Sequence, residues 1–154
     1  MTEIERKFLV NSEKFPRTES KVVMKQGYLS VDPERVVRVR IEGDQAWITI
    51  KGRMTGISRP EFEYPVPVED AENLLLLALN PPVEKIRHRI ESEGTCWEVD
   101  EFLGTNRGLF LAEVELDEEL QEFHRPGWLG EEVTSDRRYY NSWLSVHPFS
   151  TWKD

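Results

Sequence analysis

The sequence predicts a mostly β protein of the α+β type, in which one antiparallel sheet carries a few helices. About eight segments alternate charged and apolar residues, as β-strands with one polar and one apolar face do. Their charged faces gather in doublets of one sign, whereas an ordinary water-facing surface would mix its charges with Ser, Thr and Asn. These doublets are Glu3/Glu5, Arg38/Arg40, Glu61/Glu63, Lys85/Arg87 and Glu113/Glu115.

Length and composition fit a single domain over residues 1–154. The chain is long enough to bury a core, and five Trp and seven Phe supply bulky packing groups. The net charge of −9 argues against a general nucleic-acid binder, because no basic excess can displace counterions from a phosphate backbone. The single Cys96 suits a reducing compartment, and no segment reads as a leader or a membrane span. We therefore expect a soluble cytoplasmic protein without a nucleic-acid or membrane partner.

The first strand, Glu3–Val10, sets the pattern. It places Glu3, Glu5 and Lys7 on one face and mainly apolar residues on the other. Two carboxylates about 6–7 Å apart, followed by an ammonium, can hold a divalent cation beside an anionic ligand. Taken alone, the same pattern describes an edge strand whose charges discourage aggregation. Its repetition along the chain favours the ligand-binding interpretation.

The next strands follow after a loop or short helix at residues 11–20. They are expected at 22–31, 36–42, 46–51 and 59–64. Gly27 indicates a bulge or a close approach of another backbone, and residues 43–45 form the turn of a hairpin. Pro60 cannot donate a ladder hydrogen bond, so it marks an edge, a start or a bulge.

The clearest helix is Val68–Leu79. Its first turn is acidic, as the helix dipole favours, and Asn80-Pro81-Pro82 stops it. Four consecutive leucines make an apolar face too broad for a free surface helix, so we expect this helix to cover part of the sheet.

The second half of the chain returns to alternation. Strands are expected at 85–90, 97–102 and 109–116, followed by a short helix at Asp117–Phe123, a segment at Trp128–Thr134, and a turn entering a C-terminal helix over 136–144. The hairpin that ends in Trp97 resembles the one that ends in Trp47. Its turn differs by one residue, so side-chain parity slips in the second return strand. Core or rim packing is the expected role of both tryptophans.

Two architectures can use these strands. An ordinary sandwich turns the apolar faces inward and the charged faces to water. A closed eight-stranded antiparallel β-barrel instead encloses the charged faces in a tunnel, and its apolar outer face then needs helices or a partner subunit, as in a homodimer. The three acidic and two basic doublets nearly balance in such an interior once Lys7, Lys51 and Arg59 are added.

The chemistry of a charged interior is narrow, because buried charges must be paired or bound to ions. Facing carboxylates suit Mg²⁺ or Mn²⁺, and opposed Arg and Lys side chains suit an extended polyanion. A ligand that needs both at once is a nucleotide or an inorganic triphosphate.

The ordered motifs resemble those of the CYTH superfamily, the triphosphate tunnel metalloenzymes. Glu3-Ile4-Glu5-Arg6-Lys7 is similar to the N-terminal ExExK signature of this family. The similarity continues through residues 26–29, 38–40, 49–51, 59–63, 85–87, 97–100, 111–115 and 133–141, and so covers almost the whole chain. The resemblance implies an eight-stranded tunnel that binds a triphosphate together with a divalent metal.

The same resemblance implies roles for individual residues. The expected metal ligands are Glu3, Glu5, Glu61, Glu63, Asp100, Glu113 and Glu115, with orientation of a basic residue as the alternative for Asp100. The expected substrate-binding residues are Lys7, Arg38, Arg40, Lys51, Arg59, Lys85, Arg87 and Arg138. The catalytic group is expected to consist of Glu3, Glu5, Lys7, Glu113 and Glu115.

Compact members of this family that hydrolyse inorganic tripolyphosphate are the most similar, which implies a metal-dependent triphosphatase. Three other functions stay open. Another triphosphatase would act on thiamine triphosphate or nucleoside triphosphates, and an adenylate cyclase of class IV type would release cyclic AMP in place of free phosphate. A non-catalytic module would bind polyphosphate without turnover.

Overall fold

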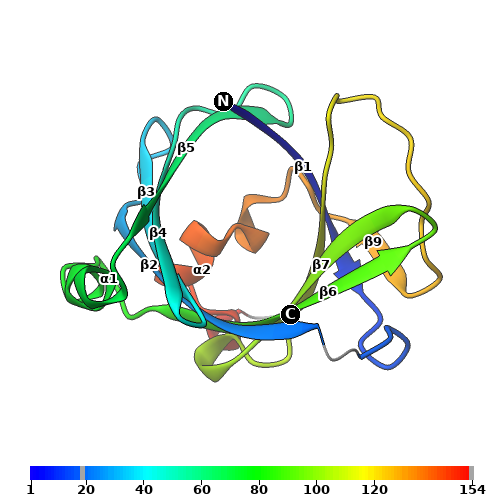
Figure 1. Cartoon of the computed structure of the whole chain (residues 1–154). Coiled ribbons are helices and arrows are strands. Elements are labelled where there is room, and N and C mark those ends of the chain that lie inside the picture. Colours follow the sequence, from blue (N-terminus) through cyan, green and yellow to red (C-terminus); the bar gives the residue numbers. More distant parts are fainter. Residues whose placement is uncertain (18–19, 153–154) are drawn as a thin grey trace.

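The computed structural model describes residues 1–17 and 20–152, and in this part of the chain eight antiparallel strands close into a barrel (Figure 1). Around the ring they follow the order β1-β5-β4-β3-β2-β6-β7-β8, and β8 pairs with β1 again. The strands of the barrel are β1 (Thr2–Val10), β2 (Lys21–Ser30), β3 (Val36–Glu42), β4 (Gln45–Lys51), β5 (Ser58–Val66), β6 (Val83–Ser92), β7 (Thr95–Phe102) and β8 (Phe110–Glu115). The predicted eight-stranded barrel is confirmed, and the sandwich is excluded.

The seam of the barrel lies between β1 and β5. Only the start of β1 pairs with β5, from Thr2 opposite Pro60 to Ile4 opposite Ser58. The far end of β1 pairs instead with an additional strand, β9 (Leu129–Glu132). This ninth strand falls in the segment expected at residues 128–134, and it exists because β1 extends beyond its contact with β5.

Helix α1 (Val68–Leu75) and the segment before β9 cover apolar parts of the outer face of the barrel. The helix packs on β3 and β4 through Ala71 and Leu75, and the segment that leads into β9 covers Phe8 and Trp97. Gly27 makes a close contact here, but with a side chain and not with the backbone that the sequence led us to expect: a Cβ at Gly27 would lie 2.8 Å from Leu75 Cδ2. None of the helices in the described residues is long and apolar enough to cross a membrane.

Helix α1 ends four residues earlier than the sequence predicts. After Leu75 the chain tightens into turns, and the Leu79 N–H donates to the Tyr28 carbonyl on β2 at 3.0 Å. This bond draws the chain back to the barrel before the helix can continue. The helix covers part of the sheet, as the sequence predicts, but Leu76 and Leu77 stay 82% and 71% exposed.

The predicted helix at residues 117–123 is also wrong, because these residues form turns and irregular structure. The Asp117 N–H donates to the side chain of Gln121, and Glu119 accepts from the Ile57 N–H at 3.3 Å. Leu120 is 93% exposed, whereas Phe123 packs against Phe8 and Trp97, so the apolar residues of the segment do not share one buried face.

The far end of the barrel interior is apolar and closed. Leu111 shares its face of β8 with Glu113, and Phe102 lies opposite Lys85, yet both apolar side chains pack with Leu144 of helix α2 (Asn141–Val146). In Figure 1, α2 lies behind the opening of the barrel. The chain around α2 forms short 3₁₀ turns, η2 (Arg137–Tyr139) and η3 (Phe149–Thr151), and a third, η1 (Gly104–Asn106), precedes β8. The tunnel is therefore blind at this end.

Candidate active site

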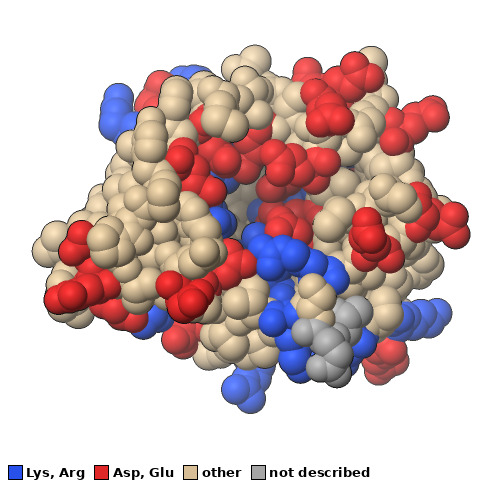
Figure 2. All heavy atoms as spheres, in the orientation of Figure 1, with Lys and Arg blue, Asp and Glu red and all other residues tan. Residues whose placement is uncertain are grey.

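The charged faces of the strands line a cavity of about 290 Å³ in the barrel. Figure 2 shows its mouth as a hollow with acidic side chains along the upper rim and basic side chains below them. In the described residues its acidic lining is Glu3, Glu5, Glu61, Glu63, Glu98, Glu113 and Glu115, and its basic lining is Lys7, Arg38, Arg40, Lys51, Arg59, Lys85, Arg87 and Arg89. The cavity is thus close to neutral in a chain of net charge −9.

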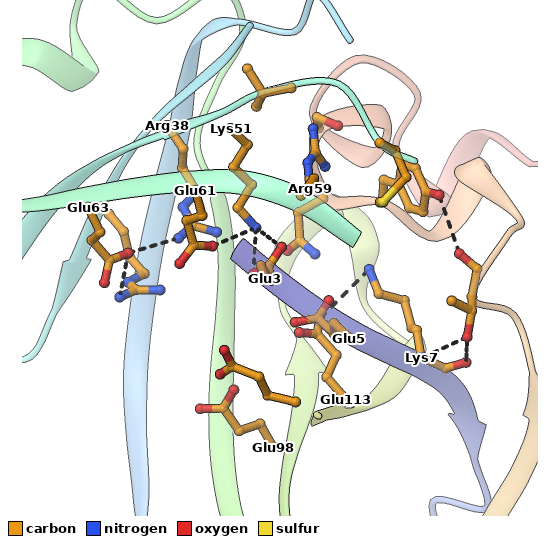
Figure 3. Close-up of a pocket in the computed structure, with 18 of the residues that line it drawn as sticks. Glu3, Glu5, Lys7, Arg38, Lys51, Arg59, Glu61, Glu63, Glu98 and Glu113 are labelled. Carbon is orange, nitrogen blue, oxygen red and sulfur yellow. Dashed lines mark hydrogen bonds and ion pairs between the residues drawn. The ribbon is translucent and has the colours of Figure 1, made fainter. Parts of the chain in front are cut away.

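Lys51 lies between two carboxylates at the seam (Figure 3). Its ammonium is 3.0 Å from Glu3 Oε1 and 3.5 Å from Glu61 Oε2. Burial opposes ionisation of Glu3, but Lys51 lowers the pKa of that carboxyl. Burial, together with the hydrogen bond that the protonated Glu61 carboxyl donates to Glu3, raises the pKa of Glu61 to about 7. The seam therefore holds two acids that share one ammonium.

A second carboxyl pair lies deeper, where Glu5 and Glu113 share a hydrogen bond. Lys7 is 3.7 Å from Glu113, and although burial opposes it, Lys7 and Arg87 hold the pKa of Glu113 well below its usual range. The pKa of Glu5 is raised well above normal by burial and by the charges of Glu113 and Glu3. Additional positive charge beside Glu5 would be strongly favoured.

Arg38 and Arg40 approach the lumen from β3. Both guanidinium groups contact Glu63 Oε2, at 3.5 and 3.6 Å, and Thr49 donates to the same oxygen at 2.7 Å. The buried Nε atoms of both arginines have no hydrogen-bond partner in the described part of the chain. Burial and the neighbouring Arg38 lower the pKa of Arg40. Two adjacent cations with unused donors suit a polyanion.

Lys85 and Arg87 occupy the deep end beside Asp100. Arg87 binds both oxygens of this carboxylate at 2.8 and 3.0 Å, and the Lys85 ammonium lies 2.8 Å from Oδ2. Burial lowers the pKa of Lys85 to about 8, although Asp100 opposes this effect. Two cations share one anion here, so the deep end keeps positive charge.

The cavity contains most of the residues that the sequence singled out, but not Asp100 or Arg138. Asp100 is fully buried behind Lys85 and Arg87. Its role as a metal ligand stays a prediction, and these contacts favour the alternative role of orienting basic residues. Arg138 is exposed, lies outside the cavity lining and is bound to Asp136, so its contact with the substrate stays a prediction. Arg59 lines the cavity and donates to the Gly52 carbonyl at 3.0 Å.

Sequence reasoning missed several polar residues of the lining. They are Tyr28, Arg89, Glu98, Thr134, Tyr140, Asn141 and Ser142. The alternation of β6 and β7 was a signal for Arg89 and Glu98, which lie directly opposite each other. The family motif at residues 133–141 includes Tyr140 and Asn141 but assigned them no role. They reach the lumen through the fold of the C-terminal segment, which strand alternation does not describe.

A divalent metal fits the donor set of this cavity. The six expected carboxylates that line it offer only oxygen ligands, which Mg²⁺ and Mn²⁺ prefer. Burial, followed by the charges of Glu113 and Glu3, raises the pKa of Glu5, and a cation beside this carboxyl would offset both effects. In the described residues no three acidic, histidine or cysteine side chains are already grouped at coordinating distances, since Lys51 and Lys7 hold Glu3 and Glu113. Binding of a metal therefore requires rearrangement of these side chains.

A closed antiparallel barrel with an ionic lumen and a blind far end defines a β-barrel tunnel protein. A family model described as CYTH domain matches residues 1–142, and the chain belongs to this family.

Named relatives are similar over nearly the whole chain. One from Acetivibrio thermocellus, named inorganic triphosphatase, is 45% identical over 153 residues, which is 99% of this chain and 98% of the relative. A second protein of the same name, from Nitrosomonas europaea, is 39% identical and covers 95% of this chain and 98% of its own length. The solved structure of the inorganic triphosphatase NE1496 superposes with a TM-score of 0.68 at 37% identity, covering 94% of this chain and 97% of that one.

Proposed function

We propose that this chain is a divalent-metal-dependent hydrolase of triphosphates, and that its substrate is inorganic tripolyphosphate, cleaved to pyrophosphate and phosphate. The observation that carries the proposal is the enclosed lumen in which basic and acidic side chains face one another. The name inorganic triphosphatase of two relatives that match nearly the full chain supports the same activity.

In this proposal the basic side chains hold the phosphate oxygens. Lys85 and Arg87 bind at the deep end, and Arg38 and Arg40 bind along the wall, where both side chains line the cavity. Lys7, Lys51 and Arg59 complete this set. Phosphoryl transfer depends more on positioning and charge stabilisation than on covalent chemistry with the protein, so a lumen of fixed cations is suited to it.

The acidic side chains hold the metal in this proposal. The expected ligands that line the cavity are Glu3, Glu5, Glu61, Glu63, Glu113 and Glu115. When bound, Mg²⁺ or Mn²⁺ supplies charge neutralisation on phosphate oxygens and a more acidic water. In the reaction, a water oxygen bonds to the terminal phosphorus as the bond from this phosphorus to the bridging oxygen breaks. Pyrophosphate leaves with that oxygen.

A panel of substrates tests the activity. Purified protein is assayed with tripolyphosphate, ATP, GTP and thiamine triphosphate, each with Mg²⁺ and with Mn²⁺. We expect tripolyphosphate to give the highest kcat/KM and one phosphate per pyrophosphate formed. Cyclic AMP from ATP, a higher kcat/KM with thiamine triphosphate, or tight binding without product would contradict the proposal and favour one of the alternatives.

Metal affinity is expected to rise with pH. Burial and neighbouring acids raise the pKa values of Glu5, Glu61 and Glu115, and that of Glu61 lies at about 7. A carboxyl with a raised pKa is protonated below that value and cannot ligate, so protons compete with the metal at low pH. Deprotonation of one such group should tighten Mn²⁺ binding about tenfold between pH 6 and pH 8.

The measurement is calorimetric titration of the protein with Mn²⁺ in the absence of substrate, which removes the titration of tripolyphosphate itself. The Glu61→Gln variant should show a weaker dependence on pH than the wild type. A Mn²⁺ dissociation constant that does not change over this range would contradict the assignment of these carboxylates.

Two expectations concern the surroundings of the protein rather than its chemistry. A cytoplasmic location and assembly into a homodimer both stay predictions. So does the choice between Mg²⁺ and Mn²⁺ as the working metal.

A further inference from the structure

Helix α2 contributes one side chain to the hydrogen bonds of the deep end. The first residue of the helix, Asn141, lines the cavity. Its Oδ1 atom accepts from the Lys85 ammonium at 2.9 Å and from Gln26 Nε2 at 3.1 Å. The two donors come from the adjacent strands β6 and β2, so a single amide oxygen connects the helix to the barrel wall.

Asn141 accepts a hydrogen bond that competes with the electrostatic attraction of the Lys85 ammonium to Asp100. The Lys85 ammonium contacts Asp100 Oδ2 at 2.8 Å on the side of the wall and Asn141 on the side of the helix. An ammonium has three N–H donors, so these two contacts leave one for a ligand. With Asn141 removed, the attraction of a buried carboxylate would dominate and draw the ammonium toward the wall.

The neutrality of Asn141 matters as much as its position. Asp100 already serves both Lys85 and Arg87, and the deep end is positive for this reason. A second carboxylate at position 141 would accept the same hydrogen bonds but would cancel that charge. An amide oxygen orients the ammonium without neutralising it.

The Asn141 side chain is itself held in place. Gln26 is only 1% exposed, and its Nε2 group also donates to the Tyr28 hydroxyl at 3.0 Å. The neighbouring Tyr139 carbonyl accepts from the Lys7 ammonium at 3.0 Å. Residues 139–141 thus contact both Lys7 and Lys85, and these contacts with buried side chains fix the position of the segment.

We propose that Asn141 is a positioning residue, which acts on the bound polyphosphate through Lys85 and not by its own contact. The inference rests on the proposed function only for the identity of the anion, tripolyphosphate. It assigns to the C-terminal helix a part in substrate affinity in addition to closing the barrel.

A double-mutant cycle tests this coupling. The variants are Asn141→Ala, Lys85→Met and the double variant. The control is Ser145→Ala on the same helix, because the Ser145 hydroxyl donates to the Ser142 carbonyl and lies outside the cavity lining. The dissociation constant for tripolyphosphate is measured by calorimetry in EDTA, and kcat and KM are measured with Mg²⁺.

We expect Asn141→Ala to weaken tripolyphosphate binding about tenfold, as the loss of an orienting partner commonly does. The effect should appear in KM more than in kcat. The double variant should bind no more weakly than Lys85→Met alone, and Ser145→Ala should bind like the wild type. Additive losses, or a loss in Ser145→Ala equal to that in Asn141→Ala, would overturn the inference.

Asn141→Asp separates positioning from a purely structural role, and it keeps the test available if Asn141→Ala fails to fold. This variant retains both hydrogen bonds, so its thermal stability should match the wild type, but its added charge should weaken tripolyphosphate binding at least as much as Asn141→Ala. Wild-type affinity in Asn141→Asp would overturn the inference. If the wild type does not hydrolyse tripolyphosphate but the variants lose affinity for it non-additively, the proposed function is refuted and the inference is supported. If the wild type hydrolyses tripolyphosphate but the losses are additive, the proposed function stands and the inference is refuted.

Discussion

Replacing Glu5 by Gln is expected to abolish metal-dependent phosphate release and to leave the fold at least as stable. Glu5 is half-buried in the cavity wall, and burial together with the charges of Glu113 and Glu3 raises the pKa of its carboxyl well above normal. A neutral amide of the same shape removes this repulsion, so the melting temperature in EDTA should not fall. The same change removes a proposed ligand. Because changes to groups that merely orient ligands cost about 10–100-fold, loss of a ligand should cost about 10²-fold or more.

The prediction is tested by measuring phosphate release and metal binding on the same variant. Phosphate release from tripolyphosphate is compared with the rise in melting temperature that Mg²⁺ or Mn²⁺ produces, and Glu5→Gln should lose both. Glu72→Gln is a suitable control, since Glu72 is exposed on α1 and forms an ion pair with Lys25, away from the cavity. Retained turnover in Glu5→Gln would remove Glu5 from the metal site.

Replacing Arg38 by Gln is expected to lower kcat/KM for tripolyphosphate by about 10²–10³-fold, the effect of removing one preorganised donor to a developing negative charge. Arg38 reaches the lumen with an unpartnered buried Nε, and it contacts Thr49 and Glu63 through Nη2. Glu63 keeps Arg40 and Thr49 as partners in the variant. No buried carboxylate is therefore left unpaired, and the fold should persist.

The charge of Arg38 and its planar shape can be separated. Arg38→Lys keeps the charge but loses the fork of parallel donors, so its kcat/KM should lie between those of the wild type and Arg38→Gln. Arg35→Gln is the matched control, because Arg35 is exposed in the turn before β3 and pairs with Asp32. A change of less than about twofold in Arg38→Gln would contradict a role in binding phosphate, since even one lost charged hydrogen bond should exceed this.

Alternation predicted the strands well, but it could not decide which way their charged faces point. A period of two residues is the same in a sandwich and in a barrel, and closure depends on contact between β1 and β5, which are far apart in the sequence. The repetition of like-charged doublets and the family motifs favoured the barrel. The one-residue difference between the two hairpin turns also had the expected effect, since Trp47 lies opposite Arg40 whereas Trp97 lies opposite Ile90.

Position along a strand was harder to predict than the face of the strand. Asp100 and Glu98 have the same parity on β7, yet Glu98 lines the cavity and Asp100 lies at the border of the apolar far end. Parity gives the direction of a side chain and not its depth in the barrel. The contact between Asn141 and Lys85 could not be predicted for another reason. It forms because the C-terminal segment folds across the end of the barrel.

The seam between β1 and β5 would connect binding of the proposed metal to closure of the barrel. In the described residues its ladder, Thr2–Ile4 against Ser58–Pro60, is the shortest in the ring, and Glu3 and Glu61 lie on its two sides and share a hydrogen bond. A cation held by both carboxylates would therefore bridge the seam. Loss of the first few residues would open the barrel at the seam and also remove Glu3, a proposed ligand. The amino terminus therefore has to be left intact when the protein is tagged or trimmed.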